Sequence, residues 1–282
     1  MKRIVSIQDL SCVGKCSLGI ALPVLSVMGL ECAALPTALL SAHTAFDGFF
    51  CRDLTDCIGP ITAHWQNAGL RFDAIATGYL GSCAQMRLVE AMFDRFDVPL
   101  RFVDPAMADH GRLYSGVDPE LPQEMRRLAQ RADMVTPNVT EACLLTGLPY
   151  DPQPTDAALE RLFDGLLALD VDTAVITGIR CGDGLVRTAA ASRSGERFSV
   201  EAPDIPGVFH GTGDLFAAVC AGALTLGLTA KSAVSLAARF VAEALEQTRC
   251  DPDARWYGVQ FEPVLARLPE LLRETKMKED LT

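Results

Sequence analysis

Short apolar segments and longer amphipathic segments alternate along most of this 282-residue chain. The short segments have the length and composition of buried strands, and the longer ones carry apolar side chains at helical spacing. Two parallel strands need a long crossover connection, which is usually a helix. The alternation therefore predicts an α/β fold with three layers, in which a mostly parallel central sheet is covered by helices on both faces.

The expected elements follow from these segments. Strands are predicted at residues 3–7, 32–36, 74–77, 100–103, 134–135 and 173–176, with a hairpin of strands 185–190 and 197–201. Helices are predicted at residues 17–28, 56–68, 82–96, 119–131, 138–146, 155–169, 212–226, 229–247 and 261–274.

The chain is predicted to form one domain over residues 1–282. Hydrophobic residues make up 49% of it, which is enough for a large core, and no Pro/Gly/Ser-rich linker or repeat divides it. The charged tail, residues 275–282, is expected to be frayed. Ten cysteines are scattered without a Cys-x-x-Cys pair, so we interpret them as structural thiols.

The charge and the hydropathy pattern exclude several classes of function. The net charge is −11 and basic residues form no patch, which argues against a nucleic-acid partner. Apolar runs are too short for a membrane span, and the apolar run at the N-terminus is too short for a signal peptide. We therefore expect a cytoplasmic protein with no membrane partner.

The stretch from His210 to Asp214 is the strongest indication of function. Gly211, Thr212 and Gly213 precede a long run of small apolar residues that is typical of a buried helix. Free backbone N–H groups at a helix start bind anions. The carboxylate of Asp214 beside such a site suits a base that takes a proton from a hydroxyl attacking a phosphoryl group. The stretch predicts phosphoryl transfer to an alcohol.

Other polar segments follow the predicted strands, at residues 6–15, 41–48, 77–82, 104–114, 136–141 and 177–184. Ligands of open α/β sheets bind beyond the carboxyl ends of the strands. Carboxylates of Asp104, Asp109 and Glu141 fall in these segments and suit Mg²⁺. Glu141 has a second interpretation, because Asn138 is a good helix N-cap and Glu141 stands at the position that completes a capping box.

Three further candidates each allow two interpretations. Lys15 belongs to a stretch that fails the Walker A pattern, and it either faces the substrate or is a solvated loop residue. Tyr79 either stacks on a flat ligand ring or fills its own loop. His43 and Thr44 either bind polar groups of a substrate or are structural.

Taken together, these motifs resemble the ribokinase-like superfamily, and within it the pyridoxal/pyridoxine/pyridoxamine (vitamin B6) kinases. The resemblance covers nearly the whole chain. The sequences that carry it are SIQ at 6–8, SAHT at 41–44, GYLGS at 78–82, DPAM at 104–107, TPNVTE at 136–141 and GTGDLF at 211–216.

The resemblance implies a kinase that transfers a phosphoryl group from ATP to the 5′-hydroxymethyl group of a B6 vitamer, in pyridoxal 5′-phosphate salvage. Its members are usually homodimers. It implies that Asp214 is the base and that Gly211, Thr212 and Gly213 form the anion hole. It further implies that Mg²⁺, with K⁺ as a candidate monovalent ion, binds near Asp104, Asp109 and Glu141. Nucleotide contacts are implied for Asp104, Thr136, Glu141 and Thr177. The implied pyridine site consists of His43, Thr44 and Tyr79.

The chain departs from the family pattern at three places. Asp9 stands where the family commonly has serine, and its carboxylate can accept a hydrogen bond from an amine or a protonated ring nitrogen, which favours pyridoxamine or pyridoxine as substrate. His210 replaces an apolar residue of many relatives, and the loop 108–114 is short. These departures bear on the choice of substrate.

Several rival functions can be compared with this one. A hydroxymethylpyrimidine kinase of thiamine synthesis would share the fold and the base. A non-catalytic B6-binding protein would not need Asp214. Sugar and nucleoside kinases of the superfamily usually carry a di-glycine motif near the N-terminus, which this chain lacks. A Rossmann dehydrogenase is disfavoured because no Gly-x-Gly-x-x-Gly follows the first strand.

Overall fold

The computed structural model describes residues 1–182 and 184–281. Its centre is a nine-stranded sheet with the order β11-β10-β9-β8-β5-β4-β1-β2-β3. The strands are β1 (Arg3–Ser11), β2 (Glu31–Leu40), β3 (Cys51–Asp53), β4 (Ala74–Thr77), β5 (Leu100–Val103), β8 (Met134–Val135), β9 (Thr173–Arg180), β10 (Leu185–Ser192) and β11 (Arg197–Pro203). The six strands from β9 to β2 in this order pair in parallel, and the remaining strands, at the two edges, pair antiparallel.

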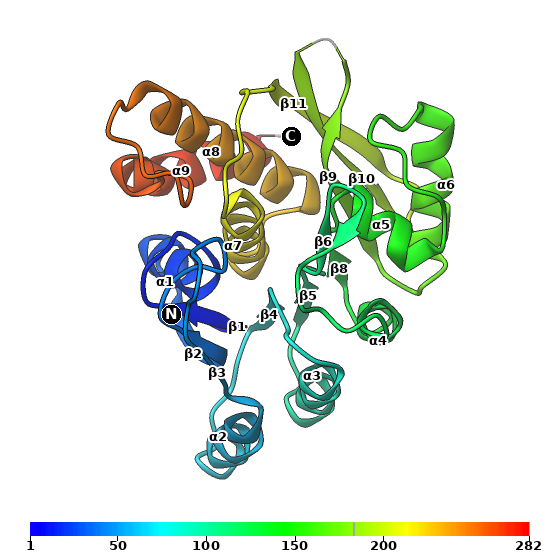
Figure 1. Ribbon diagram of the computed structural model, residues 1–282. Coiled ribbons are helices and arrows are strands. Elements are labelled where there is room, and N and C mark those ends of the chain that lie inside the picture. Colours follow the sequence, from blue (N-terminus) through cyan, green and yellow to red (C-terminus); the bar gives the residue numbers. More distant parts are fainter. Residues whose placement is uncertain (183, 282) are drawn as a thin grey trace.

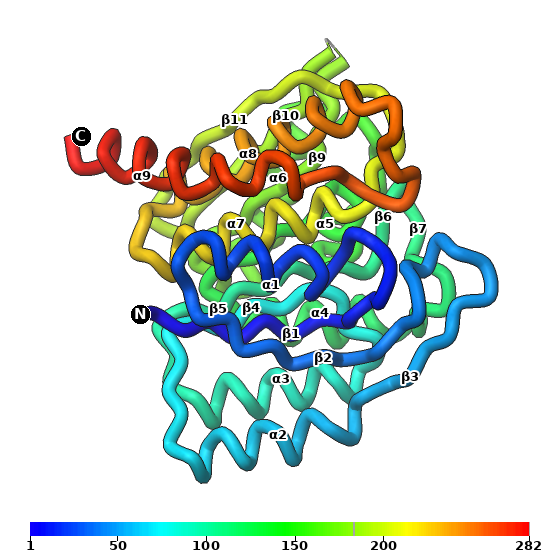
Figure 2. The backbone as a smooth tube through the Cα atoms, turned by 90° about the vertical axis from the view of Figure 1, so that its left-hand side faces the viewer, coloured from blue at the N-terminus to red at the C-terminus, as the bar shows by residue number. Residues whose placement is uncertain are grey.

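Two layers of helices cover the sheet (Figure 1). One layer holds α1 (Ser17–Val27), α7 (Thr212–Thr225), α8 (Ala230–Cys250) and α9 (Leu268–Glu279), with the short 3-10 helix η1 (Glu262–Arg267) before α9. The other holds α2 (Thr55–Asn67), α3 (Cys83–Arg95), α4 (Leu121–Ala129), α5 (Val139–Thr146) and α6 (Asp156–Leu167). Figure 2 shows α9 lying along α8 and reaching the C-terminal end of the described chain.

Each face of the sheet has its own hydrophobic core. On one face, α1, α7 and α8 pack against side chains such as Ile4 and Phe102, both fully buried. On the other face, Val5, Ile75 and Val103 point toward α2 to α6. Successive side chains of a strand point to opposite faces, so neighbours such as Ile4 and Val5 serve both cores. This is why the central strands are nearly continuous runs of apolar residues.

The structure confirms the predicted α/β fold with a mostly parallel sheet, but several predicted bounds were wrong. Strands β1 and β9 run to Ser11 and Arg180, because polar residues continue them beyond their apolar segments. Strand β2 runs to Leu40 through residues that follow Pro36 and are mostly apolar. The segments 6–15 and 177–184 therefore lie partly within strands. Strand β3 was missed because its three residues are all exposed and carry no apolar alternation.

Two further differences concern segments predicted as loop or tail. Residues 108–113 form a small hairpin of β6 (Ala108–Asp109) and β7 (Arg112–Leu113), whose turn residues His110 and Gly111 both have positive φ. Helix α9 extends to Glu279, five residues beyond the predicted end. Of the predicted loop 177–184 and tail 275–282, residues 183 and 282 lie outside the described part of the chain.

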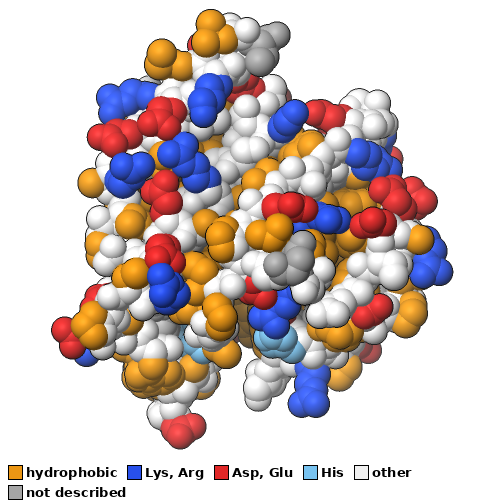
Figure 3. Space-filling model, turned by 90° about the horizontal axis from the view of Figure 1, so that it is seen from above, with side chains coloured by type: hydrophobic (Ala, Val, Ile, Leu, Met, Phe, Trp, Pro, Cys, Tyr) orange, Lys and Arg blue, Asp and Glu red, His pale blue; other side chains and the backbone are white. Residues whose placement is uncertain are grey.

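The order of the strands places a topological switch point beside β1, and the region beyond the strand ends there is called the crevice. Strand β2 pairs with one edge of β1, and β4, which comes later in the chain, pairs with the other edge. The connections on the two sides of β1 therefore run in opposite directions. Open α/β sheets bind ligands at such a switch point, beyond the carboxyl ends of the strands. Figure 3 views the molecule from above, on the side where β11 lies in Figure 1, and shows acidic and basic side chains interspersed there. No helix within the described residues is long and apolar enough to cross a membrane.

Candidate active site

The turn before α7 brings the β1–α1 connection against the start of this helix. Gly211 is the N-cap residue and has φ +84°, a left-handed conformation that favours glycine. A Cβ at this position would stand 2.1 Å from the backbone oxygen of Lys15. The first helical hydrogen bond runs from the N–H of Leu215 to the oxygen of Gly211, at 2.9 Å. The N–H groups of the preceding turn therefore have no helical acceptor and suit an anion.

Asp214 lies in the first turn of α7 and is held in place from the β1–α1 connection. Its carboxylate accepts a hydrogen bond from the backbone N–H of Ser17. Burial, followed by the charge of Asp9, raises the pKa of Asp214 to about 6. A carboxylate with this pKa is ionised at neutral pH and is a stronger base than an exposed aspartate, which suits general-base chemistry.

Asp9 lies on β1 at the crevice. Between the Gln8–Pro36 and Leu10–Leu39 pairs, two residues of β2 stand opposite Asp9 alone, so the ladder contains a β-bulge here. The buried carboxylate accepts hydrogen bonds from the hydroxyls of Ser11 at 3.3 Å and Ser17 at 2.5 Å. Burial raises the pKa of Asp9, although both hydroxyls oppose that rise.

A second acidic group lies beyond β5 and β8. Asp104 is buried and accepts a hydrogen bond from the hydroxyl of Thr136 at 3.1 Å. Burial, followed by the charges of Glu141 and Asp214, raises the pKa of Asp104. The hydroxyl of Thr136, predicted to contact nucleotide, is thus directed to this carboxylate.

Glu141 forms the complete capping box of α5. It accepts from the N–H of Asn138 at 2.9 Å and from the N–H of Met107 at 3.0 Å, and its own N–H donates to the side chain of Asn138. Burial raises the pKa of Glu141 to about 8 against the lowering effect of these hydrogen bonds. The capping interpretation of Glu141 is confirmed, and the same side chain anchors the loop after Asp104.

The structure does not assemble the three-carboxylate metal site. Among residues 1–182 and 184–281, no group of three His, Cys, Asp or Glu side chains could hold a metal ion. Asp109 accepts from the N–H of its neighbour His110 at 2.7 Å, and its side chain is 53% exposed. The turn of the β6–β7 hairpin thus engages Asp109, whereas Asp104 and Glu141 remain close enough for their charges to interact.

His43 and His210 lie in contact at the crevice. Their ring centroids are 4.7 Å apart. Tyr79 is half-buried after β4, and burial followed by the charge of Asp9 raises the pKa of its phenol, so the phenol is close enough to Asp9 for that charge to act on it. Thr44 is exposed in the loop between β2 and β3. The structure therefore brings His43 and Tyr79 to the crevice but leaves Thr44 at its rim.

Thr177 lies within β9 rather than after it. Thr177 and Gly178 stand opposite a single residue of β10, and Gly178 has φ +68°, so this is a second β-bulge. The N–H of Thr177 donates to the oxygen of Pro137 at 2.9 Å, which places it beside Thr136 at the strand ends. Lys15 is not a solvated residue: its amine pairs with Glu262 and lies over the ring of Phe261.

Two residues near the carboxylates escaped the sequence analysis. Ser17 has φ +48° and binds both Asp9 and Asp214, a role that depends on backbone geometry which its sequence context does not reveal. Tyr114 follows the β6–β7 hairpin and is 42% exposed as a residue. Desolvation of its phenol, followed by the charges of Glu141, Asp109, Asp214 and Asp104, raises the pKa of that group. The one feature of the sequence that could have pointed to Tyr114 as a site residue is its position after a glycine-containing turn.

Cys16 is buried close enough to Asp214 and Asp9 for both of their charges to act on its thiol. Burial, followed by the charges of Asp214 and Asp9, raises the pKa of its thiol to about 12. The thiol is therefore protonated at physiological pH.

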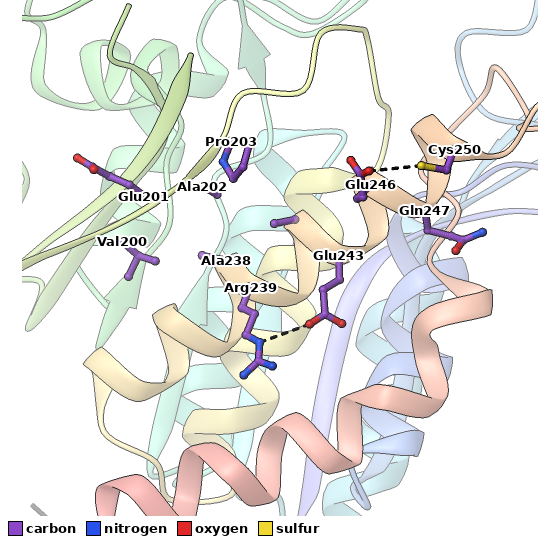
Figure 4. A pocket seen from close by; sticks show the side chains of 11 residues that line it. Val200, Glu201, Ala202, Pro203, Ala238, Arg239, Glu243, Glu246, Gln247 and Cys250 are labelled. Atoms are coloured by element: carbon purple, nitrogen blue, oxygen red, sulfur yellow. Dashed lines mark hydrogen bonds and ion pairs between the residues drawn. The ribbon is translucent and has the colours of Figure 1, made fainter. Parts of the chain in front are cut away.

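A separate groove of about 540 Å³ lies between β11 and α8 (Figure 4). Small apolar side chains, such as Ala202 and Ala242, form part of its lining, and Arg239 and Glu243 pair at 3.4 Å beside it. The groove contains none of the predicted site residues. Its strand wall ends at Pro203, and the chain then continues directly to the turn before α7.

Known proteins are similar to this chain in sequence and in fold. The phosphomethylpyrimidine kinase family model matches residues 62–255. A pyridoxal kinase from Rubrobacter xylanophilus is 30% identical over 260 residues, which are 87% of each chain. The chain belongs to the pyridoxal kinase family.

Solved structures agree with this assignment. A candidate phosphomethylpyrimidine kinase from Bacteroides thetaiotaomicron, in a crystal form with pyridoxal, has a TM-score of 0.90 and 36% identity, with 95% of both chains covered. A pyridoxal kinase from Lactobacillus plantarum has a TM-score of 0.89 and 35% identity, with 97% of this chain and 99% of that chain covered. The ribokinase-like architecture and the phosphotransferase class expected from the sequence are confirmed.

The close approach at Gly211 predicts a specific loss of stability. In Gly211→Ala, the new Cβ meets the backbone oxygen of Lys15 and the residue must adopt a positive φ. Gly227→Ala is the matched control, because Gly227 has φ +96° but open space around its Cβ. The control should lose about 1 kcal/mol from backbone strain, and Gly211→Ala should lose more. Chemical denaturation measures both, and equal losses would contradict the contact.

Proposed function

We propose that this kinase phosphorylates the 5′-hydroxymethyl group of a vitamin B6 vitamer, with ATP as the phosphoryl donor, in pyridoxal 5′-phosphate salvage. The observation that carries the proposal is the start of α7, where free N–H groups adjoin Asp214 with its pKa of about 6. The kinase names of the relatives and the pyridoxal in the related crystal form support the choice of acceptor.

In this mechanism Asp214 is the general base. It takes the proton of the hydroxymethyl group as the hydroxyl oxygen attacks the γ-phosphorus of ATP, and ADP leaves. The N–H groups of Gly211, Thr212 and Gly213 would stabilise the charge on the transferring phosphoryl group, because an oriented helix start does so without reorganisation. The hydrogen bond from Ser17 keeps the carboxylate of Asp214 oriented.

The acidic groups fit a bound cation. Some charges interact within the group formed by Asp9, Asp104, Glu141 and Asp214. Within the described residues, the ion pairs formed by Lys, Arg and His side chains involve other carboxylates. Like charges in a partly buried site are costly without a counterion. Asp104 and Glu141 would hold Mg²⁺, or K⁺ as a further candidate. Mg²⁺ supplies charge neutralisation for the ATP phosphates.

ATP would lie across the strand ends in the C-terminal half of the sheet. Thr136 and Thr177 are neighbours there and would contact its phosphates. The groove between β11 and α8 is large enough for a nucleoside, and its small apolar side chains suit a flat base. The nucleotide would lie along the chain between this groove and the turn at Gly211, with its base in the groove and its γ-phosphate at the turn. We further propose a cytoplasmic homodimer, as the family resemblance implies.

The vitamer would occupy the crevice at β1. Tyr79 would contact the pyridine ring, His43 and Thr44 would bind its polar substituents, and Asp9 would accept from an amine or a protonated ring nitrogen. The burial of Asp9 favours a cationic partner, because its carboxylate has hydroxyl partners but no basic side chain beside it among the described residues.

A hydroxymethylpyrimidine kinase is the second candidate. The family model that matches residues 62–255 carries the name phosphomethylpyrimidine kinase, which favours it. Such an enzyme would use the same base and the same anion-binding turn.

A coupled assay of ADP formation tests the proposed function. Pyridoxal, pyridoxine, pyridoxamine and hydroxymethylpyrimidine are compared at equal ATP and Mg²⁺ concentrations. We expect the highest kcat/KM with a B6 vitamer. The highest kcat/KM with hydroxymethylpyrimidine would show that the chain is a hydroxymethylpyrimidine kinase. ADP formation with none of the four would favour a non-catalytic B6-binding protein.

Asp214→Asn should lower kcat by about 10² to 10⁴-fold with little change in KM, because proton transfer acts in the transition state. In the unsubstituted enzyme, kcat/KM should fall tenfold per pH unit below about 6. The sign follows because the base works ionised and protonates as pH drops through its raised pKa. Steady-state kinetics from pH 5 to 8 measure both effects. Near-full turnover in the variant would rule out Asp214 as the base.

Asp9→Ser should shift preference toward pyridoxal, relative to pyridoxamine and pyridoxine, because the counter-charge is removed. It should also move the acid limb of kcat/KM to lower pH, since the charge of Asp9 raises the pKa of Asp214. Kinetics with the three vitamers measure both, with Asp97→Ser, at an exposed position between α3 and β5, as the control. An unchanged ratio among the vitamers would contradict the role of Asp9 in specificity.

A further inference from the structure

His210 joins two parts of the site that come from distant segments of the chain. It immediately precedes Gly211 of the phosphoryl-binding turn, and its ring lies 4.7 Å from that of His43 with an interplanar angle of 48°. The backbone oxygen of His210 accepts from the N–H of Val259 at 3.0 Å, which fixes the segment from the C-terminal side.

The loop between β2 and β3 contacts the same C-terminal segment independently. The ring of Phe46 lies 4.7 Å from that of Trp256 and 5.3 Å from that of Tyr257. The backbone of His43 is held as well, because its N–H donates to the oxygen of Val13 at 2.7 Å. Both histidines are therefore carried on restrained backbone, and the contact between their rings is a fixed feature of the site.

Hydrogen bonding defines the protonation state of His43. Its Nδ1 accepts a hydrogen bond from the N–H of Ala45 at 3.0 Å. Nδ1 therefore carries no proton, and the neutral ring carries its proton on Nε2. A ring in this state offers one donor to a substrate, whereas protonation at Nδ1 would break the contact with Ala45.

We propose that His210 is a positioning residue for the vitamer: its ring fixes the orientation of the His43 ring, and thereby couples the loop that binds the vitamer to the turn that binds the transferring phosphoryl group. The kinetic consequence rests on the proposed function, whereas the ring arrangement does not.

The electrostatics of the pair support this role. Two imidazoles in contact resist carrying two positive charges, and burial followed by the charge of His210 lowers the pKa of His43. The surrounding segments also carry Lys15 and Glu262, which pair with each other, Asp214 on α7, Tyr257 in the C-terminal segment and Asp47 in the loop of His43. Among these described groups, the charge of His210 is the one that acts on His43.

The kinetic test compares His210→Ala with His210→Phe. Removing the ring should raise the KM for the vitamer about fivefold, with kcat and the KM for ATP changed less than twofold, because the lost contact orients His43 rather than the base. Phenylalanine keeps a flat ring at the same place and should restore most of the KM. Val208→Ala is the matched control, since Val208 lies in the same segment and is 75% exposed.

Two kinetic results would overturn the proposal. One is an unchanged vitamer KM in His210→Ala. The other is an equal defect in His210→Phe, which would assign the effect to the imidazole nitrogens rather than to ring packing. Thermal unfolding of each variant separates a loss of fold from a loss of orientation.

A second measurement does not depend on catalysis. The chain has four histidines, so nitrogen-15 NMR of the ligand-free protein can resolve His43. We expect the Nε2–H tautomer, with a titration midpoint below that of a free histidine, and a higher midpoint in His210→Ala. An Nδ1–H tautomer, or equal midpoints in the two proteins, would overturn the proposal even if the kinase assay succeeds. If no vitamer is phosphorylated, the proposed function fails and NMR alone decides the ring arrangement.

Discussion

The backbone contact between Gly211 and the carbonyl oxygen of Lys15 holds the candidate site together. It brings the connection after β1 against the first turn of α7, although the two segments are almost 200 residues apart in the sequence. This close approach places the N–H of Ser17 within reach of Asp214, while the hydroxyl of Ser17 binds Asp9 on its own side of the site. A larger residue at 211 would separate Asp214 from the β1 side of the crevice.

Electrostatic repulsion is the second constraint on the site. Burial raises the pKa values of Asp104 and Asp214, the charges of Glu141 and Asp214 add to the rise for Asp104, and the charge of Asp9 adds to the rise for Asp214, so negative charge is costly in this group. Nucleotide with its cation would relieve this repulsion, and binding energy from that relief would be available when the substrates are in place. Hydrogen bonds from backbone N–H groups to Glu141 and from hydroxyls to Asp9 stabilise the negative charge of these carboxylates in the absence of ligands.

The sequence predicted the layers of the fold and most of the elements because buried strands and amphipathic helices leave clear periodicities. It failed where structure depends on distant pairing: β3 has no apolar face, and β1 continues through polar residues because β2 lies beside it. The same limit applies to the site. Asp214 was recognisable from its glycine-rich context, whereas Ser17 acts through a positive φ and Asp109 is turned into its own hairpin.

The thiol of Cys16 has a consequence for the aldehyde form of vitamin B6. An aldehyde and a cysteine thiolate add readily to each other, and a thiolate beside the reacting centre would trap the substrate as a hemithioacetal. Burial, together with the charges of Asp214 and Asp9, raises the pKa of this thiol to about 12, so it stays in its poorly nucleophilic form. Under the proposed function, burial and the carboxylates at the reacting centre would together protect the enzyme from a covalent dead end, and from oxidants that attack thiolates.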